Sequence, residues 1–541
     1  RSEDSLKTIN ALLRAGECVC LFPEGAISRN GQLGKFHTGY ERAVEGVEEG
    51  VIVPFYLHGL WGSSLSRADE GLRYARAPGL RRDLIVAFGE PLPLDTGAKQ
   101  LKQKVFDLSL MAWQSHTGKL DPLPLAWLRA ARRRGSGISV VDSGGARLSH
   151  RQLVARVAGM SRIVRNDARE SRVGILLPAS MDTAVTTLAI LMQGKVVVPL
   201  NYTLGEDALA RIIRESGVKR VFTTRDFHTE AGASMGVAMD GLDLLYVEDV
   251  EQAPWHSVLP WLAAIFLPPA WIYRLLGRPV DIEAAAAILY TRGHQARVKG
   301  VVLSHRNLMT NCRQMSDVLN TRVDDVMMSC LPPFHALGLT VTTLMPLVEG
   351  IPMVCHPDPR DAPGVARAIA RNRATILVAT SSLLSLYPDD ASIHALMLAS
   401  LRVVVAGAER LDEQVRRNFE LKFGKPVYEG YGATETAPVV SVNVPDAMDT
   451  SDWKVQQGNI PGTVGLPVPG TSVRIVDPVS LEPVTLGEDG LILVAGSQVM
   501  SGYLGDELAS AGAILEMDGM RWFCSGDRGH LTEEGFLVIA V

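Results

Sequence analysis

The chain has 541 residues, of which 47% are hydrophobic and 21% are charged, and its formal net charge is -5. This length predicts roughly three or four compact units, and the composition excludes a disordered chain. A protein dedicated to nucleic acid would carry a basic face, so we expect no nucleic-acid partner.

The cysteines and the two ends of the chain indicate its setting. The six cysteines are scattered and form no CxxC pair, which is typical of reduced thiols in the cytosol. Metal binding by Cys18 and Cys20 is disfavoured because no second pair stands nearby. The sequence begins at Arg1 within an amphipathic helical pattern and ends at Val541 within a strand-like run. We therefore expect a fragment that is cut at both ends.

The first recognisable block covers residues 18–62. An apolar run into Phe22, a turn at 23–25, a helical stretch over 39–49 and a second apolar run over 51–57 predict strand, loop, helix and strand.

The loop after this first run contains Glu24, Gly25 and Arg29. The carboxylate suits a hydrogen bond to a glycerol hydroxyl, and the arginine suits pairing with a phosphate. FPEG followed by serine and arginine, and then VPFYLHG, resembles the third and fourth motifs of the glycerolipid acyltransferases; a chance turn is the alternative. The resemblance implies that residues 1–112 are the C-terminal part of an acyltransferase domain, with Glu24, Gly25 and Arg29 binding its substrate. The family's HxxxxD motif would precede this block, so these residues alone should not transfer an acyl group.

Residues 113–137 end in the basic stretch RAARRRGSG, and we interpret them as a linker. Its arginines suit contact with anionic lipid headgroups, and a solvated run of charge is the alternative. They are Arg129, Arg132, Arg133 and Arg134. From residue 138 on, apolar β-branched runs alternate with helical segments, which predicts a parallel sheet covered by helices on both faces.

The most apolar stretch is WHSVLPWLAAIFLPPAWIYRLL, residues 255–276. It is nominally long enough to span a membrane, but Pro260, Pro268 and Pro269 interrupt it. We therefore expect a monotopic hairpin or an amphipathic segment that lies among lipid headgroups. A buried pair of helices is the alternative.

Residues 287–307, AILYTRGHQARVKGVVLSHRN, combine an apolar strand-like run, a polar loop and a β-branched run. Such a loop after a buried strand suits phosphate, because its N–H groups point inward and a lysine supplies a mobile positive charge. The stretch resembles the phosphate loop of the adenylate-forming ligases, the acyl-CoA synthetase superfamily, whose pattern is YTSGTTGxPKGVxxSH. A surface loop is the alternative. The resemblance implies a catalytic role for Lys299 and nucleotide binding by Thr291, Gly293 and Gly300.

The middle of this loop departs from the family pattern. Arg292 in place of serine would donate a stronger, charge-assisted hydrogen bond. Ala296 in place of glycine would strain the loop by roughly 1–2 kcal/mol if a positive φ is needed there. The other departures are His294, Gln295 and Val298.

Two later segments also resemble parts of this family. CLPPFHALG places His335 and Gly338 on a turn after an apolar run, as in the family segment that borders the acyl pocket; a histidine satisfied within the core is the alternative. Gly407, Ala408 and Glu409 fall where the family packs against the adenine.

The stretch VYEGYGATETAPVVS matches the family pattern YGxTE without a substitution. Tyr431 and Gly432 offer an aromatic face to an adenine, and Thr434 offers a hydroxyl to a phosphate. Glu435 supplies a carboxylate that can hold Mg²⁺. By this resemblance Thr434 and Glu435 are catalytic and Tyr431 and Gly432 bind the nucleotide.

A last segment, WFCSGDRGHLTEEGFLVI, resembles the family run TGDxGxxxxxGFLxI. The resemblance implies that Asp527 binds the ribose hydroxyls, with Ser525 in place of the usual threonine.

These segments predict an α/β fold: a partial acyltransferase unit followed by the large lobe of an adenylate-forming ligase, with stacked mixed and parallel sheets. The lobe would cover residues 138–541, with 440–541 as its β-rich subdomain. The family's mobile lid domain, with its catalytic lysine, would be absent.

The order of motifs resembles the bifunctional acyltransferase and acyl-acyl-carrier-protein synthetases that salvage lysophosphatidylethanolamine. The resemblance implies that ATP and Mg²⁺ serve to activate a fatty acid, that acyl carrier protein accepts the acyl group, and that a lysophospholipid finally receives it. It also implies a membrane surface as partner, at the cytoplasmic face of the bacterial inner membrane. Two alternatives remain: a long-chain fatty acyl-CoA synthetase, and a lapsed ligase kept as a lipid- or carrier-binding module.

Overall fold

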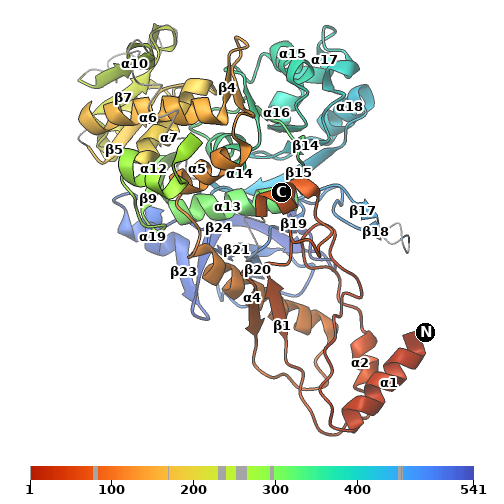
Figure 1. Cartoon of the computed structure of the whole chain (residues 1–541). Coiled ribbons are helices and arrows are strands. Elements are labelled where there is room, and N and C mark those ends of the chain that lie inside the picture. Colours follow the sequence, from red (N-terminus) through yellow and green to blue (C-terminus); the bar gives the residue numbers. More distant parts are fainter. Residues whose placement is uncertain are drawn as a thin grey trace.

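The structure is a computed structural model that describes residues 2–76, 83–167, 170–229, 239, 241–251, 265–292, 298–448, 453 and 455–540. Within these residues the chain forms three large sheets of seven, nine and five strands, with an N-terminal segment beside the third (Figure 1). The predicted α/β architecture is confirmed.

The first sheet has seven strands, in the order β22 (Gly502–Tyr503), β10 (Val298–Ser304), β9 (Ala285–Arg292), β6 (Val196–Pro199), β5 (Arg172–Ile175), β7 (Arg220–Thr223) and β8 (Asp243–Tyr246). Strands β5 to β9 run parallel, and β10 folds back antiparallel on β9. The helices of this part are α6 (His150–Asp167), α7 (Met181–Met192), α8 (Glu206–Ser216), α10 (Val247–Glu251) and α12 (Pro269–Leu276).

The second sheet has nine strands, in the order β19 (Leu466–Pro467), β16 (Val439–Val442), β15 (Val427–Gly432), β14 (Val403–Ala406), β13 (Ile376–Ala379), β11 (Met327–Ser329), β12 (Met353–Cys355), β3 (Ile138–Val141) and β4 (Arg147–Ser149). The strands from β15 to β3 are parallel. Their carboxyl ends therefore lie at one edge, where α/β sheets usually bind ligands.

The largest core is shared by these two sheets and the helices between them. Helix α13 (His305–Val318) starts where β10 ends, and Ser304 and Asn307 cap it reciprocally. The other helical segments of this part are η3 (Leu337–Leu344), α14 (Met345–Glu349), α15 (Ala362–Asn372), α16 (Ser381–Leu384), α17 (Leu386–Asp389), η4 (Ala395–Leu398), α18 (Glu413–Phe423) and η5 (Thr434–Thr436).

The third sheet is antiparallel and lies below the other two in Figure 1. It has its own core, in which Val473, Ile492 and Leu537 are buried. Its strands are β20 (Thr471–Val476), β21 (Gly490–Gly496), β24 (Met520–Leu531), β23 (Ile514–Met517) and β25 (Leu537–Ile539). The remaining elements are α19 (Glu507–Ala513) and the pair β17 (Ala447–Met448) and β18 (Val455–Gln456).

The N-terminal segment was predicted only in part. Its second apolar run contributes β1 (Phe55–His58), which pairs with β2 (Ile85–Phe88). The predicted strand over residues 18–22 is wrong: it finds no neighbouring strand among the described residues, and an apolar run alone does not make a strand. The helices here are α1 (Ser2–Arg14), α2 (Gly39–Ala43), α3 (Glu70–Arg76) and α4 (Ala98–Thr117).

The stretch 113–137, predicted as a linker, instead contains the end of α4 and helix α5 (Leu123–Arg134). Leu123 and Trp127 are completely buried in the largest core, so α5 belongs to the folded lobe. The basic run that suggested a linker is the last turn of this helix, where positive charge is favourable.

Arg129, one turn earlier, and Arg132 and Arg134 of that last turn are also engaged within the protein. Arg129 forms an ion pair with Asp121 at 3.0 Å. The guanidinium of Arg132 donates to the carbonyl oxygen of Ile265, and Arg134 stacks over the ring of Tyr74. Their contact with lipid headgroups stays a prediction, with fewer free charges than the sequence suggests.

A buried ion network joins the N-terminal segment to the ligase-like lobe. From α3, Arg76 pairs with Asp317 at 2.8 Å and with Glu349 at 2.6 Å, and Arg313 pairs with the other oxygen of Glu349 at 2.9 Å. Burial acts to lower the pKa of Arg76, but the two carboxylates raise it above its ordinary value. The segment is therefore held on α13 and α14 by paired, buried charge.

The apolar stretch 255–276 is described from residue 265 onward, and residues 252–264 lie outside the described part. Helix α12 packs Ile272 and Tyr273 into the largest core. None of the helices that the structure describes is long and apolar enough to cross a membrane.

Candidate active site

The described residues on either side of the predicted phosphate loop form β9 and β10, which pair antiparallel. Lys299 lies opposite Thr291 and Gly300 opposite Tyr290 in the antiparallel register. A side chain at Gly300 would come within 3.1 Å of the Tyr290 ring, so glycine allows the two strands to close. Gly293 and the departures at 294–296 lie outside the described residues.

The Tyr431–Glu435 corner joins β15 to β16. At Gly432 an added Cβ would lie 2.0 Å from the carbonyl oxygen of Pro438, so the turn requires glycine there. Thr434 and Glu435 form a short helical turn, in which Thr434 is partly exposed and Glu435 is nearly buried.

Tyr503 connects the corner to the hairpin. The amine of Lys299 lies over the Tyr503 ring, 4.5 Å from its centroid, and the Tyr503 hydroxyl donates a 2.8 Å hydrogen bond to Glu435 Oε1. Strand β22 brings Tyr503 there by pairing with β10, where Tyr503 lies opposite Val301. Burial, and then Glu435, raise the pKa of Tyr503, so the phenol stays a hydrogen-bond donor. The two predicted phosphate-site segments thus meet through one aromatic side chain.

Tyr503 was missed by sequence reasoning. It lies in the segment SQVMSGYLG, and nothing in the local pattern indicated its partners. A signal did exist: an aromatic residue in a motif that follows a buried strand is a candidate site residue.

The predicted adenine and ribose residues are also adjacent. The Tyr431 hydroxyl donates a 2.6 Å hydrogen bond to Asp527 Oδ2, and the backbone N–H of Asp527 donates to the hydroxyl of Ser525 at 3.1 Å. Burial and Asp527 raise the pKa of Tyr431. Serine at 525 therefore fixes the aspartate's backbone without the usual threonine.

Gly407, Ala408 and Glu409 follow β14 at the edge where β15 also ends. An added Cβ at Gly407 would lie 3.6 Å from the carbonyl oxygen of Gly430, so this turn and the Tyr431 corner are close. Ala408 has a φ of 70°, a left-handed conformation that costs about 1–2 kcal/mol for a residue with a side chain. The Glu409 carboxylate accepts a hydrogen bond from the backbone N–H of Ser382.

His335 and Gly338 lie at the start of the π-helical segment η3. His335 is exposed and packs against Phe334 at 4.5 Å between ring centroids, so it is not a core histidine. Phe334 in turn meets Tyr202 edge-on at 4.8 Å. An added Cβ at Gly338 would lie 2.0 Å from the carbonyl oxygen of Pro332, so only glycine fits. Phe334, which follows β11 of the second sheet, and Tyr202, which follows β6 of the first sheet, are therefore in contact.

The predicted acyltransferase residues lie on the N-terminal segment. Glu24 Oε2 accepts a 2.7 Å hydrogen bond from the backbone N–H of Gly34, and burial raises the pKa of this carboxyl. Gly25 has a φ of 65°, and the backbone N–H of Arg29 donates to Gln456 Oε1 at 2.7 Å. One carboxylate oxygen of Glu24 therefore already accepts a hydrogen bond from the loop that follows it. Substrate binding by these residues stays a prediction.

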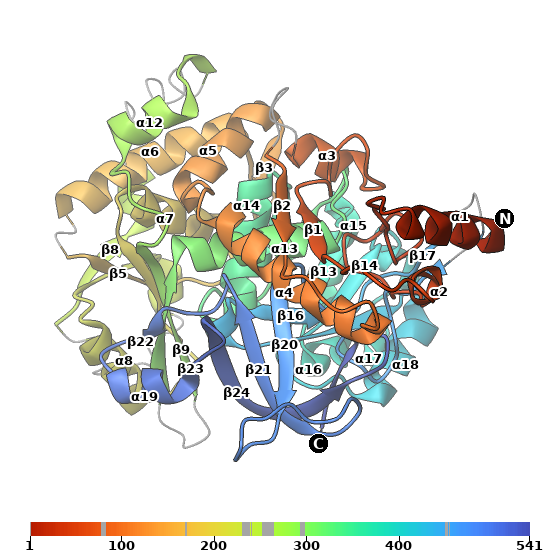
Figure 2. The same ribbon diagram turned by 90° about the horizontal axis from the view of Figure 1, so that it is seen from below.

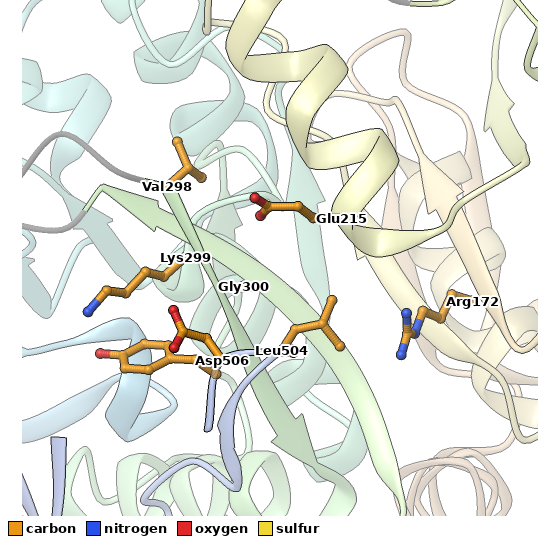
Figure 3. Close-up of a pocket in the computed structure, with 9 residues that line it drawn as sticks. Arg172, Glu215, Val298, Lys299, Gly300, Leu504 and Asp506 are labelled. Atoms are coloured by element: carbon orange, nitrogen blue, oxygen red, sulfur yellow. The ribbon is translucent and has the colours of Figure 1, made fainter. Parts of the chain in front are cut away.

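A cavity of about 530 Å³ lies beside the hairpin. Figure 3 shows Lys299 and Arg172 at opposite sides of it, with Glu215 and Asp506 between. Among the predicted site residues that the structure describes, catalytic Lys299 and nucleotide-binding Gly300 are the ones that line this cavity.

The residues present fit Mg²⁺ and ATP. Glu435 uses Oε1 for Tyr503, and in the described part of the chain its Oε2 makes no hydrogen bond. Mg²⁺ with ATP is commonly held by one or two carboxylates plus phosphates and water. Lys299 supplies positive charge at the same place, so the donor set suits a metal-bound polyphosphate.

Comparisons with known proteins support the assignment of a nucleotide-binding site. Residues 127–504 match the family model described as AMP-binding enzyme, and residues 1–58 match the one described as acyltransferase. The long-chain-fatty-acid–CoA ligase of Yersinia pestis is 28% identical over 390 residues, covering 68% of this chain and 67% of that protein. The feruloyl-CoA synthase of an Amycolatopsis species is 29% identical over 416 residues, covering 76% and 77%.

Solved structures agree on the fold. Apo MatB from Rhodopseudomonas palustris has a TM-score of 0.62 at 24% identity, covering 78% of each chain. A long-chain-fatty-acid-CoA ligase from Archaeoglobus fulgidus has a TM-score of 0.64 at 19% identity, covering 77% of this chain and 83% of that one. The predicted adenylate-forming ligase fold is confirmed.

Proposed function

Because the chain belongs to the AMP-binding enzyme family, we propose that it activates a long-chain fatty acid with ATP and transfers the acyl group to the thiol of coenzyme A. The similarity to long-chain-fatty-acid–CoA ligases supports the substrate and the acceptor. The observation that carries the proposal is the Lys299–Tyr503–Glu435 link. It joins the two segments that a nucleoside triphosphate would need for binding its phosphates.

In the first step the fatty-acid carboxylate attacks the α-phosphorus of ATP, and pyrophosphate leaves. Lys299 lowers the cost of the charge that develops on the phosphate oxygens. Thr434 offers a hydroxyl to a phosphate oxygen. Mg²⁺, held by Glu435, would neutralise further charge on the leaving pyrophosphate.

The nucleoside end is served by different residues. Tyr431 presents a ring face for the adenine, while Asp527 accepts from the ribose hydroxyls. In the second step the thiol of coenzyme A loses its proton to solvent and its sulfur attacks the acyl carbonyl carbon. The bond from this carbon to the phosphate oxygen breaks, and AMP leaves with the bonding electrons. His335 belongs to the segment that resembles the family's acyl-pocket border, so we expect it and the adjacent aromatic residues to contact the acyl chain.

The proposal is tested by fatty-acid-dependent exchange of labelled pyrophosphate into ATP. We expect exchange with palmitate or oleate to exceed that with ferulate, and thioester to form with coenzyme A. Lys299→Met should abolish exchange, whereas the exposed control Lys119→Met should retain it. No exchange with any carboxylic acid would contradict the proposal.

A second candidate takes acyl carrier protein as acceptor and passes the acyl group to a lysophospholipid. The match of residues 1–58 to the acyltransferase family favours it, as does the buried Arg76 network that holds this segment on the ligase lobe. Incubation with ATP, labelled fatty acid, holo carrier protein and lysophosphatidylethanolamine separates the two. Label in phosphatidylethanolamine supports the second candidate, and label only in acyl-CoA supports the first.

The altered phosphate loop favours a third candidate, a lapsed ligase that binds lipid or carrier protein. The test is reversion to the family pattern in one variant, with Arg292→Ser, His294→Thr, Ala296→Gly and Val298→Pro. Exchange only after reversion would identify a lapsed site. Exchange by the natural sequence would exclude it.

A further inference from the structure

The outward face of α12 and the residues just before this helix are apolar where a protein surface is normally polar. Trp271 and Leu275 of α12 are 61% and 58% exposed, and Phe266, three residues before the helix, is 71% exposed. Trp271 and Leu275 stand one helical turn apart, so they lie on the same face. The opposite face holds Ile272 and Tyr273 in the core. The helix is therefore apolar both inside and outside.

The charges on the segment itself are positive. Arg274 and Arg278 are exposed beside the apolar residues, and residues 265–280 contain no aspartate or glutamate, the next acidic residue being Asp281. Lysine and arginine next to exposed tryptophan, phenylalanine and leucine are the composition of segments that lie in the headgroup region of a bilayer.

The face is also held in place. The guanidinium of Arg132 donates to the carbonyl oxygens of Ile265 and Leu267, at 2.5 and 3.3 Å, on either side of Phe266. Figure 2 shows α12 at the rim of the molecule, outside α5 and α6. Its apolar side chains are thus presented outward by a fixed backbone.

We propose that the outer face of α12 binds the surface of a membrane that contains anionic lipid. Phe266, Trp271 and Leu275 enter the boundary between headgroups and acyl chains, and Arg274 and Arg278 pair with lipid phosphates. A second copy of the chain is disfavoured as the occupant, because a symmetric interface would place this cationic face against itself. This inference is independent of the proposed function.

The test is co-sedimentation of the whole protein with vesicles of phosphatidylcholine plus phosphatidylglycerol, and with phosphatidylcholine alone. We expect binding to the mixed vesicles that weakens with salt. The triple variant Phe266→Ser/Trp271→Ser/Leu275→Ser should lose at least about tenfold in partitioning. The double variant Arg274→Gln/Arg278→Gln should lose binding to mixed vesicles toward the level seen with phosphatidylcholine.

The matched control is Leu421→Ser, which removes a leucine that is 84% exposed on α18. Binding that is unchanged in the triple variant, or reduced equally by the control, would overturn the proposal. A concentration-dependent dimer in size-exclusion chromatography that the triple variant abolishes, without vesicle binding, would assign the face to a second copy and also overturn it. Unchanged thermal unfolding of the variants keeps these outcomes interpretable.

Discussion

The hydroxyl of Tyr503 donates a 2.8 Å hydrogen bond to Glu435, and its ring lies under the amine of Lys299. One side chain thus sets the spacing between the phosphate-loop lysine and the carboxylate suited to Mg²⁺. The hydroxyl acts on the carboxylate and the ring acts on the lysine, so the two contributions can be separated by substitution.

Tyr503→Phe keeps the ring and removes the hydroxyl. A hydrogen bond to a charged group contributes about 1.5–3 kcal/mol, so we expect kcat/KM for ATP in pyrophosphate exchange to fall by a factor of about 10 to 150. The Mg²⁺ concentration for half-maximal exchange should rise as well. Tyr503→Leu, which also loses the cation–π contact, should fall further. Tyr246→Phe, whose hydroxyl meets His228 elsewhere, is the control; equal effects of both phenylalanine variants would contradict this role.

Arg76→Met removes the cation shared by Asp317 and Glu349. Breaking a buried pair leaves carboxylate charge without its partner, so the free energy of unfolding should fall by about 3–5 kcal/mol. Urea denaturation measures this loss. The exposed pair Arg42–Glu3 provides the control, since Arg42→Met should change stability by less than about 0.5 kcal/mol. A similar small change in Arg76→Met would show that the network does not hold the segment.

Two buried histidines make stability depend on pH. Burial lowers the pKa of His305 to about 4, and burial with nearby Arg134 does the same for His150. Between the unfolded pKa near 6.5 and this value the unfolded chain binds more protons, so stability falls as pH falls. From pH 7 to pH 5 each histidine should cost about 2 kcal/mol. Denaturation midpoints that do not fall over this range would contradict it, and His305→Gln should reduce the slope.

Ala408→Gly relieves the left-handed backbone at the predicted adenine turn. Glycine adopts this conformation without a side-chain clash but has more freedom when unfolded, so we expect a net gain of about 0.5–1 kcal/mol in unfolding free energy. The control Ala406→Gly, within β14, should destabilise instead. A loss of stability in Ala408→Gly would mean that the turn is not strained.

The fold was largely predictable, because alternating apolar runs and helical segments specify a parallel sheet without long-range information. The pairing of Tyr431 with Asp527 could be expected only from the family resemblance. Tyr503 could not be found locally: its partners are set by β22 pairing with β10, across about two hundred residues of chain.

The two wrong predictions, a strand over residues 18–22 and a linker over residues 113–137, have the same cause. The run at residues 18–22 reads as a strand, but strand formation depends on a neighbour that the local sequence does not specify. The arginines after Trp127 suggested a linker, although the apolar positions before them form the buried face of α5. In both cases the secondary structure depends on tertiary packing, which the local composition does not specify.

The central claim is that the β9–β10 hairpin and the corner from Tyr431 to Glu435 hold one nucleotide. Calorimetric titration of the protein with ATP and Mg²⁺ tests it most directly, with Lys299→Met from the hairpin and Asp527→Asn from beside the corner. We predict one site per chain, and about tenfold or greater weakening in each variant. Unaltered affinity in either variant, or no binding by the natural sequence, would contradict the claim.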